Sequence, residues 1–435
     1  MSVLGLPANQ NGCPSITGTS RGAAYQWNGR TVWGPVAARI RAEASGDWDD
    51  SIAVERFKSR GGFLIHGKGR LIGHRSVAVG EQTFQARRGI VIATGSKPAI
   101  PPTPGLSEVN YWTKHDLIQK KELPESLTIL GGGAVGCEFG QALSRFGVKV
   151  TIVEGGTRLL PAEEPEASAA VKEAFRAEGI LVQTGSTVHS VWEQDQLIGM
   201  TLVNGHKIVS ERLLIATGRK VDVENLGLES IGLQPIGPYV PVDDHLCVAD
   251  GIWAMGDVTG IGMFTHVALY QSAIIAANIL GKDHPPARYD AIPRVTFTDP
   301  EVGSVGFTEA EALANGFNGL AVTKQIPATF RGWLHAAGSG MIKLIVDRDT
   351  GKLIGGSTAS PYGGELLGLL GFAIHTGAKL ADLRNMIYAF PTFTGAIGEA
   401  VGAFGRGLAT VIDPSYRGFE YLDTIRRSTL VKPTG

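Results

Sequence analysis

The 435-residue sequence is poor in cysteine and balanced in charge, and each of these features excludes a class of protein. Its three cysteines, Cys13, Cys137 and Cys247, lie far apart, so no C-x-x-C or C-x-x-x-x-C segment exists to form a local redox pair or zinc knuckle. The formal net charge is −1 and no run of Lys or Arg stands out, which argues against a nucleic-acid partner. The ten histidines are scattered without ligand spacing, so no metal site is expected.

Targeting and membrane signals are also missing from the sequence. Residues 1–7 lack a cationic start and a long apolar core, so a secretory signal is not expected. The most apolar later stretch, residues 366–374, is too short to span a bilayer. With 43% hydrophobic and 19% charged residues, the composition is typical of a globular protein with two or three domains. We therefore expect a cytoplasmic protein without a membrane span.

The most informative segment ends on Glu154 and predicts a dinucleotide-binding unit. An apolar strand at 126–130 leads into the pattern Gly-x-Gly-x-x-Gly at 131–136. Apolar residues then recur at helical spacing until Gly147 ends the helix, and a second strand at 148–153 completes the unit. Its position between two strands and the acid at its end separate this fingerprint from a chance glycine-rich loop.

The three fingerprint glycines have different expected roles. Gly131 allows the tight turn, Gly133 lets the backbone approach the pyrophosphate, and Gly136 lets the helix pack closely on the strand. The free N–H groups and the positive dipole end of the helix attract the phosphates. Glu154 would accept hydrogen bonds from ribose hydroxyls and repel a 2′-phosphate, so NADH is favoured over NADPH. The residues expected to bind the pyridine nucleotide are Gly131, Gly133, Ala134, Val135, Gly136, Glu138, Glu154, Val188 and Gly218.

Two further segments, 89–95 and 212–218, repeat one another, because each is an apolar strand that ends in Ala-Thr-Gly. The second follows the dinucleotide unit at the distance needed for the remaining strands of that domain. The first suggests another domain built on the same plan. A third strand, at 251–258, ends on Gly-Asp before a helix expected from Thr265 to Leu280.

Together these segments resemble the flavoprotein disulfide reductases, also called pyridine nucleotide-disulfide oxidoreductases, a family that includes dihydrolipoamide dehydrogenase and mercuric reductase. The resemblance covers most of the chain, from about Gly34 to about Thr410. Besides the fingerprint, four motifs carry it: IATGS at 92–96, IATGR at 215–219, AMGDV at 254–258 and RVTFTDPEV at 294–302.

The resemblance implies an α/β fold with two Rossmann-like dinucleotide-binding domains and a C-terminal α+β dimerisation domain, which makes a homodimer. The FAD-binding domain is expected to be N-terminally incomplete, because residues 1–60 hold no second Gly-x-Gly-x-x-Gly. The expected organisation is an irregular lead at 1–33, the FAD-binding domain at 34–108 and 237–290, the NAD(H)-binding domain at 109–236, the dimerisation domain at 291–420 and a tail at 421–435.

Secondary structure in the C-terminal part can be predicted from turns and periodicity. Strands at 341–346 and 353–356 flank the turn at 347–351, and an apolar helix is expected at 363–377. A further helix is expected near the N-terminus, around 36–43. Because the first βαβ unit of the family pattern is not found, we expect the N-terminal domain to be the least stable part.

The family pattern also implies where FAD would bind. Asp257, at the end of a strand, would accept a hydrogen bond from a ribityl hydroxyl, although a plain turn residue is the alternative. The helix after residues 263–266 would direct its N-terminal dipole at the pyrimidine edge of the flavin. His266 is expected to begin this helix rather than to act as a base. The residues expected to bind FAD are Thr94, Gly95, Ser96, Asp257, Met263, Phe264, Thr265 and His266.

The sequence departs from the disulfide-reducing members at two independent places. It lacks their Cys-x-x-x-x-Cys segment, and Phe390 and Gly395 stand where they have a histidine and its carboxylate. Glu399 survives further on, and a helix-start acid is the alternative role for it. Cys137 is expected to be a small buried residue rather than a reactive thiol. These features are similar to family members that act as NAD(P)H:quinone reductases.

We therefore expect an FAD-dependent oxidoreductase that passes electrons from NAD(P)H to a quinone-like acceptor. No catalytic side chain is predicted, since hydride transfer to a flavin requires none. Glu138 would lie near the nicotinamide, with a helix-surface acid as the alternative. Two other hypotheses stay open: a flavin-free, NADH-binding, dimerising remnant of a reductase and, less favoured, a dihydrolipoamide dehydrogenase-like disulfide reductase.

Overall fold

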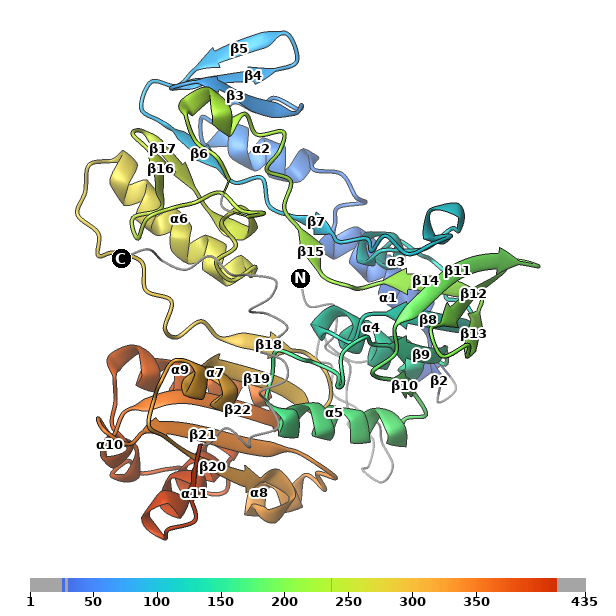
Figure 1. Cartoon of the computed structure of the whole chain (residues 1–435), viewed down its shortest axis with the longest axis vertical. Coiled ribbons are helices and arrows are strands. Elements are labelled where there is room, and N and C mark those ends of the chain that lie inside the picture. The colour runs from blue at the N-terminus through green and yellow to red at the C-terminus, as the bar shows by residue number, and fades with distance from the viewer. Residues whose placement is uncertain (1–25, 28–29, 236, 413–435) are drawn as a thin grey trace. The chain divides into compact units, whose positions relative to one another are not determined.

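The computed structural model describes residues 26–27, 30–235 and 237–412 (Figure 1). Most of the expected lead and the whole expected tail lie outside these residues. The described residues divide into two compact units: the first contains those up to Trp48, Ile100–Thr217 and 293–412, and the second contains Asp49–Ala99 and Gly218–Ile292. The domain boundaries expected from the sequence stay predictions.

In the first unit, a parallel sheet carries the dinucleotide fingerprint. Its strands lie in the order β10-β9-β8-β14. The predicted strand–helix–strand pattern is confirmed: β8 (Ser126–Leu130) leads into α4 (Ala134–Arg145) and then into β9 (Lys149–Val153). The side chains of Leu127 and Ile129 are fully buried, as is usual for a parallel strand covered on both faces.

The other elements of this part complete the sheet and flank it. They are β1 (Gln26–Trp27), β2 (Arg30–Thr31), α1 (Trp33–Arg39), a π-helical turn (Ile40–Ala44), α3 (Lys114–Ile118), α5 (Pro165–Ala177), β10 (Leu181–Gln183), β14 (Arg212–Ile215), and an antiparallel sheet of β11 (Val188–Gln194), β12 (Leu197–Leu202) and β13 (Lys207–Ser210). The helix expected around 36–43 is thus present as α1 and the π-helical turn that continues it.

The same unit contains a six-stranded sheet from the C-terminal part of the chain, in the order β18-β19-β22-β21-β20-β23, with all neighbours antiparallel. The strands are β18 (Arg294–Thr296), β19 (Glu301–Gly306), β20 (Gly319–Gln325), β21 (Met341–Asp347), β22 (Leu353–Ser360) and β23 (Thr410–Val411). The predicted hairpin is confirmed as β21 and β22.

Helices from two parts of the chain pack on this sheet (Figure 1). Helix α9 lies against β19 and β22, and α11 lies against β20 and β21. Helix α5, which follows the dinucleotide fingerprint, packs against β21 and β22. The helices of the C-terminal part are α7 (Glu309–Ala314), α8 (Phe330–Leu334), α9 (Gly363–Thr376), α10 (Leu380–Arg384) and α11 (Phe393–Gly405). The helix expected at 363–377 is therefore confirmed.

The second unit contains two strand ends that were predicted for an FAD-binding domain. They are the first Ala-Thr-Gly, at 93–95, and the Gly-Asp at 256–257. Its elements are α2 (Ser51–Ser59), β3 (Gly69–Gly73), β4 (Ser76–Val79), β5 (Gln82–Gln85), β6 (Ile90–Ile92), β7 (Lys97–Pro98), β15 (Arg219–Lys220), β16 (Cys247–Ala249), β17 (Ile252–Ala254) and α6 (Thr265–Ile279). Strands β6 and β17 pair in parallel, and every residue of α2 is at least partly exposed.

One predicted strand is shorter than expected. The segment 251–258 stays extended only through β17, because Gly256 adopts a φ of +76° and begins a 3₁₀ turn that ends at Thr259. This turn places Asp257 at the carboxyl end of β17. The α/β class with a C-terminal α+β part is confirmed. Among the helices of the described residues, none is long and apolar enough to cross a bilayer.

Candidate functional site

The fingerprint turn requires glycine at two positions for steric reasons. Gly131 has a φ of +114°, and a Cβ atom there would lie 2.4 Å from the carbonyl oxygen of Ala216. A Cβ on Gly136 would lie 2.0 Å from the carbonyl oxygen of Gly131, so any side chain would push the helix away from the turn. Both glycines therefore act through the fold of the turn, as the sequence predicts.

Gly133 differs, because it faces open space. It is the N-cap residue of α4 with an ordinary φ of −76°, and no described atom lies within 4 Å of the place that a Cβ would occupy. Ala134 and Val135 follow in the first turn of a 12-residue helix. The N–H groups of this first turn have no intrahelical acceptor. A bare backbone beside a helix N-terminus is what a pyrophosphate needs, so this turn fits a pyridine nucleotide.

Glu154 follows β9 and is held by the backbone of the same turn. Its Oε2 accepts a hydrogen bond from Gly132 N at 2.6 Å, and its Oε1 accepts one from Gly156 N at 2.6 Å. Each carboxylate oxygen retains capacity for a second hydrogen bond, which leaves Glu154 able to accept from ribose hydroxyls. Sequence reasoning found the acid but not the two backbone bonds that orient it.

Two neighbours on α4 have different environments. Cys137 is fully buried, donates to the carbonyl oxygen of Gly132 at 3.3 Å, and has its pKa raised by burial. The expectation of a buried residue is confirmed. Glu138 accepts a hydrogen bond from Phe297 N at 2.9 Å, and burial raises the pKa of its carboxyl. Glu138 is half-buried and bound to the backbone after β18, and its role beside the nicotinamide stays a prediction.

The other two residues expected to bind the nucleotide are less informative. Val188 begins β11 and packs, half-buried, on the cluster that contains Val191. Gly218 has a φ of +115° and belongs to the second compact unit, where its carbonyl accepts from Ala99 N at 3.0 Å.

In the second unit, a charged cluster forms where the strand ends meet. Ser96 Oγ donates to Asp257 Oδ2 at 2.6 Å, and Arg219 Nη2 lies 2.7 Å from the same oxygen. Arg219 Nε also donates to Ser96 Oγ. The Asp257 side chain is only 14% exposed, so its charge is held in place rather than solvated freely. Asp257 lies in the turn after β17, as both readings expect, and its role toward FAD stays a prediction.

The backbone around this cluster is open and anchored from behind. Gly95 has a φ of +69°, and within the described part of the chain nothing approaches the position of its missing Cβ. Gly256 N donates to Oε1 of the fully buried Gln271 at 2.6 Å, which fixes the turn that carries Asp257. An acid beside an open glycine backbone fits the ribityl and phosphate parts of FAD.

The residues expected at the start of α6 are found there. Phe264 is the N-cap of this 15-residue helix, and Thr265 is its first residue. The rings of Phe264 and His266 stack with centroids 5.1 Å apart, which agrees with a helix-start role for His266. Met263 packs, partly buried, on the core cluster of this unit, and Thr94 is exposed after β6.

Sequence reasoning missed Arg219 and Gln271. A signal for Arg219 was present, because it follows the second Ala-Thr-Gly as Ser96 follows the first. Both residues then meet on Asp257. No local pattern marked Gln271, since a glutamine in an apolar helix becomes informative only when its backbone partner is known.

The C-terminal run corrects one expectation about Glu399. Helix α11 begins at Phe393 with Thr392 as its cap, so Glu399 lies in the middle of the helix and is not a helix-start acid. Its Oε2 lies 2.8 Å from Nζ of Lys324 on β20. Phe390 is 73% exposed and its ring contacts that of Phe330, with centroids 5.1 Å apart.

Exposed aromatic rings gather on this part of the chain. We call Phe330, Trp333, Tyr362 and Phe390 the aromatic patch, because these residues are 49%, 68%, 50% and 73% exposed and ring contacts link the first, second and fourth. Large exposed aromatic patches usually mark interaction surfaces. Of the described residues, no group of three or more His, Cys, Asp or Glu could hold a metal ion.

Comparison with known proteins gives the same picture. Residues 40–272 match the family described as pyridine nucleotide-disulphide oxidoreductase, and residues 292–401 match the dimerisation domain of that family. A mercuric reductase from Bacillus cereus is 33% identical over 353 residues, and a dihydrolipoyl dehydrogenase from Chlorobaculum parvum is 33% identical over 347 residues. The alignments cover 80% and 78% of this chain, and 56% and 74% of the relatives.

Solved structures agree as well. The flavoprotein disulfide reductase RclA from Escherichia coli superposes with a TM-score of 0.77 at 26% identity, covering 86% of each chain. LpdA from Mycobacterium tuberculosis superposes with a TM-score of 0.76 at 25% identity, covering 86% of this chain and 84% of that one. In the alignments with the curated relatives, the chain spans little more than half the length of the mercuric reductase and about three quarters of the dihydrolipoyl dehydrogenase. It belongs to the pyridine nucleotide-disulphide oxidoreductases, a family of flavoprotein oxidoreductases that bind FAD and NAD(P)H.

Proposed function

We propose that this protein takes a hydride from NADH and passes the electrons to a small diffusible acceptor such as a quinone, without a cysteine pair. The observation that carries the proposal is the presence of two separate dinucleotide cradles. Each joins an open glycine backbone to an oriented carboxylate: Gly133 with Glu154 in the first unit, and Gly95 with Asp257 in the second. One cradle fits a pyridine nucleotide, and the other fits FAD.

The preference for NADH over NADPH follows from the negative charge of Glu154. Its carboxylate would bind the ribose hydroxyls and would repel the 2′-phosphate of NADPH. Arg158, four residues later, donates through Nη2 to the carbonyl oxygens of Pro161 and Glu163 at 2.9 and 3.0 Å. These two bonds hold the guanidinium against the backbone of the segment that leads into α5.

FAD, when bound, supplies the chemistry that accepts a hydride and releases two electrons. The task of this chain is to hold it. Asp257 would accept a hydrogen bond from the ribityl chain, with its carboxylate oriented by Arg219 and Ser96. The N-terminal N–H groups of α6 would favour negative charge on the flavin ring.

The thiols of the described residues are unsuited to disulfide chemistry. Cys137 and Cys247 are free, and burial raises the pKa of both, so neither is readily converted to the thiolate that attacks a disulfide. Phe390 stands where disulfide-reducing members have a histidine, and its side chain cannot accept or donate a proton. These features support an acceptor that takes electrons without help from a protein thiol or base.

Steady-state NADH oxidation tests this proposal. With a soluble benzoquinone as acceptor, we expect turnover with NADH to exceed turnover with NADPH by about tenfold in kcat/KM, since each ~1.4 kcal/mol of discrimination is tenfold. A lipoamide disulfide should support at least about tenfold less turnover than the quinone. The variant with Cys13, Cys137 and Cys247 all changed to alanine should keep the quinone rate within about twofold. A rate that depends on any of these cysteines, or a preference for the disulfide, would refute the proposal.

We further propose that the protein works as a homodimer. The match of residues 292–401 to a dimerisation domain supports this, and the aromatic patch offers a surface for the second copy. Buried aromatic side chains commonly supply much of the binding energy in such interfaces.

A further inference from the structure

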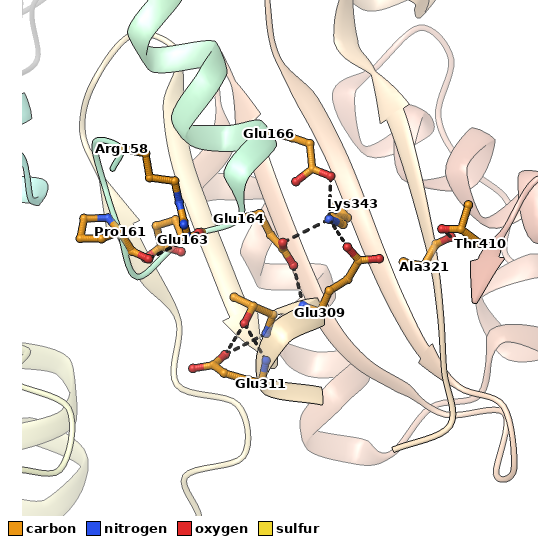
Figure 2. Close-up of polar contacts among 11 residues, drawn as sticks. Arg158, Pro161, Glu163, Glu164, Glu166, Glu309, Glu311, Ala321, Lys343 and Thr410 are labelled. Carbon is orange, nitrogen blue, oxygen red and sulfur yellow. Dashed lines mark hydrogen bonds and ion pairs between the residues drawn. The ribbon is translucent and has the colours of Figure 1, made fainter. Parts of the chain in front are cut away.

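A buried lysine of the C-terminal sheet binds the segment that leads away from the nucleotide cradle. Lys343 lies on β21 with its side chain only 1% exposed. Figure 2 shows its Nζ facing three carboxylates, with Glu164 at 3.1 Å, Glu166 at 2.7 Å and Glu309 at 2.7 Å. We call these four residues the Lys343 cluster.

Two helix N-termini also converge on this cluster. Glu164 is the N-cap of α5, Glu166 lies in the first turn of that helix, and Glu309 is the first residue of α7. Carboxylates are favoured at helix N-termini. Glu309 N also donates to Glu164 Oε1 at 2.8 Å, and the carboxylates raise the pKa of Lys343 against the effect of burial. Removal of the buried ammonium is destabilising, because it leaves the buried carboxylates without their cationic partner.

The segment 155–163, which we call the back loop, connects this cluster to the cradle. It runs from Glu154 to the start of α5 and packs on the fingerprint turn. Leu160 N donates to the carbonyl oxygen of Gly132 at 2.8 Å, and Leu159 is fully buried against Gly132, where an added Cβ would lie 2.7 Å from the Leu159 Cδ2 atom. The turn that binds Glu154 is therefore backed by this loop.

The C-terminal end of the back loop is fixed by the same sheet. Glu163 Oε1 lies 3.2 Å from Nε of Arg294 on β18, and Ser304 of β19 donates to the other oxygen. Glu164 and Glu166 then bind Lys343 on β21. Three acids within four residues thus attach the loop to three strands of the C-terminal sheet.

We propose that Lys343 is a positioning residue for the pyridine nucleotide. By holding Glu164 and Glu166 it fixes the back loop, which in turn fixes Gly132 and the Glu154 carboxylate in the arrangement that binds ribose. This inference rests on the proposed function, in which the fingerprint turn binds NADH. Loss of the ammonium would leave the binding-competent arrangement only partly populated, and the apparent affinity falls in proportion to that population.

Two variants and a matched control test the proposal. Lys343→Met removes the ammonium and keeps a similar side-chain length. Glu166→Gln removes the charge of the most exposed carboxylate, at 35%, and keeps the pairs of Lys343 with Glu164 and Glu309, so this variant is expected to fold even if the first does not. The control is Lys324→Met. Lys324 lies on β20, the neighbour of β21 in the same sheet, and this variant breaks its ion pair with Glu399 of α11.

Two readouts are measured on the purified full chain: the Kd for NADH, and amide hydrogen exchange of peptides that cover the back loop. We expect Lys343→Met to raise the Kd for NADH about tenfold, which corresponds to about one tenth of the molecules being in the binding-competent arrangement. Glu166→Gln should raise the Kd about threefold. Exchange in the back loop should quicken in both variants, while exchange in β21 and FAD content stay unchanged in Glu166→Gln. The control should match the wild type in both readouts.

The outcomes separate this inference from the proposed function. Glu166→Gln with wild-type exchange in the back loop, or with faster exchange but an unchanged Kd, would overturn the positioning role. A drop in the thermal midpoint without either change would mean that the cluster contributes only stability. If the wild-type protein binds no NADH, the proposed function fails, whereas the exchange measurement still decides whether Lys343 fixes the loop.

Discussion

Replacing Gly133 with valine is expected to abolish most NADH binding while the protein stays folded. Its φ of −76° suits any residue, and no described atom lies within 4 Å of the position of an added Cβ. That space is the proposed place of the pyrophosphate. Loss of two hydrogen bonds to a charged group, at about 1.5 kcal/mol each, weakens binding roughly 100-fold. Isothermal titration with NADH measures the change.

A second glycine of the same turn provides the contrast. Gly136→Ala places a methyl group 2.0 Å from a backbone oxygen, so it should lower the thermal midpoint and disturb the turn itself. Gly338→Val, at an open position elsewhere in this unit, should change neither NADH binding nor stability. If Gly133→Val bound NADH like the wild type, the nucleotide would not approach the backbone at this turn.

Asp257→Ala is expected to yield a protein purified with less than about a tenth of the wild-type flavin content. The substitution removes the acceptor proposed for the ribityl chain and leaves Arg219 without its carboxylate partner. Loss of a charge-assisted hydrogen bond and exposure of an unpaired charge together cost about 3 kcal/mol, or more than 100-fold in FAD affinity. The ratio of visible to ultraviolet absorbance measures flavin content directly.

The control for this variant lies in the same unit. Asp222 pairs with Lys97 at 3.1 Å on an exposed surface, where the removal of a charge has little effect. Asp222→Asn should therefore keep its flavin, whereas Asp257→Asn, which retains the shape and one acceptor oxygen, should fall between the wild type and Asp257→Ala. Equal flavin content in all four proteins would show that Asp257 does not hold the cofactor.

The parts of this structure that the sequence could predict are those built from neighbouring residues. The fingerprint turn is local, because Gly131, Gly133 and Gly136 act within one strand–turn–helix, and Glu154 follows on the next strand. The Ala-Thr-Gly end at 93–95 likewise predicted a second dinucleotide-binding unit, and the Gly-Asp end of segment 251–258, together with the family resemblance, added that segment to it. Parallel strands bring such ends to one edge of a sheet, so Ser96 and Asp257 meet.

Contacts between distant segments could not be predicted in this way. A lysine on a strand is usually exposed, and only the fold brings Lys343 to Glu164, 179 residues earlier in the chain. The same limitation applies to Glu399, whose partner Lys324 lies on a separate strand. The early end of β17 depended on the backbone conformation of Gly256, which glycine permits but does not impose.

The most direct test of the central claim is the visible absorption spectrum of the purified protein, recorded before and after NADH is added without oxygen. The proposed function predicts flavin bands that bleach on addition of NADH and return when a quinone is supplied. A colourless protein that added FAD cannot reconstitute would contradict the claim, and would favour the alternative of a flavin-free protein that binds NADH and dimerises.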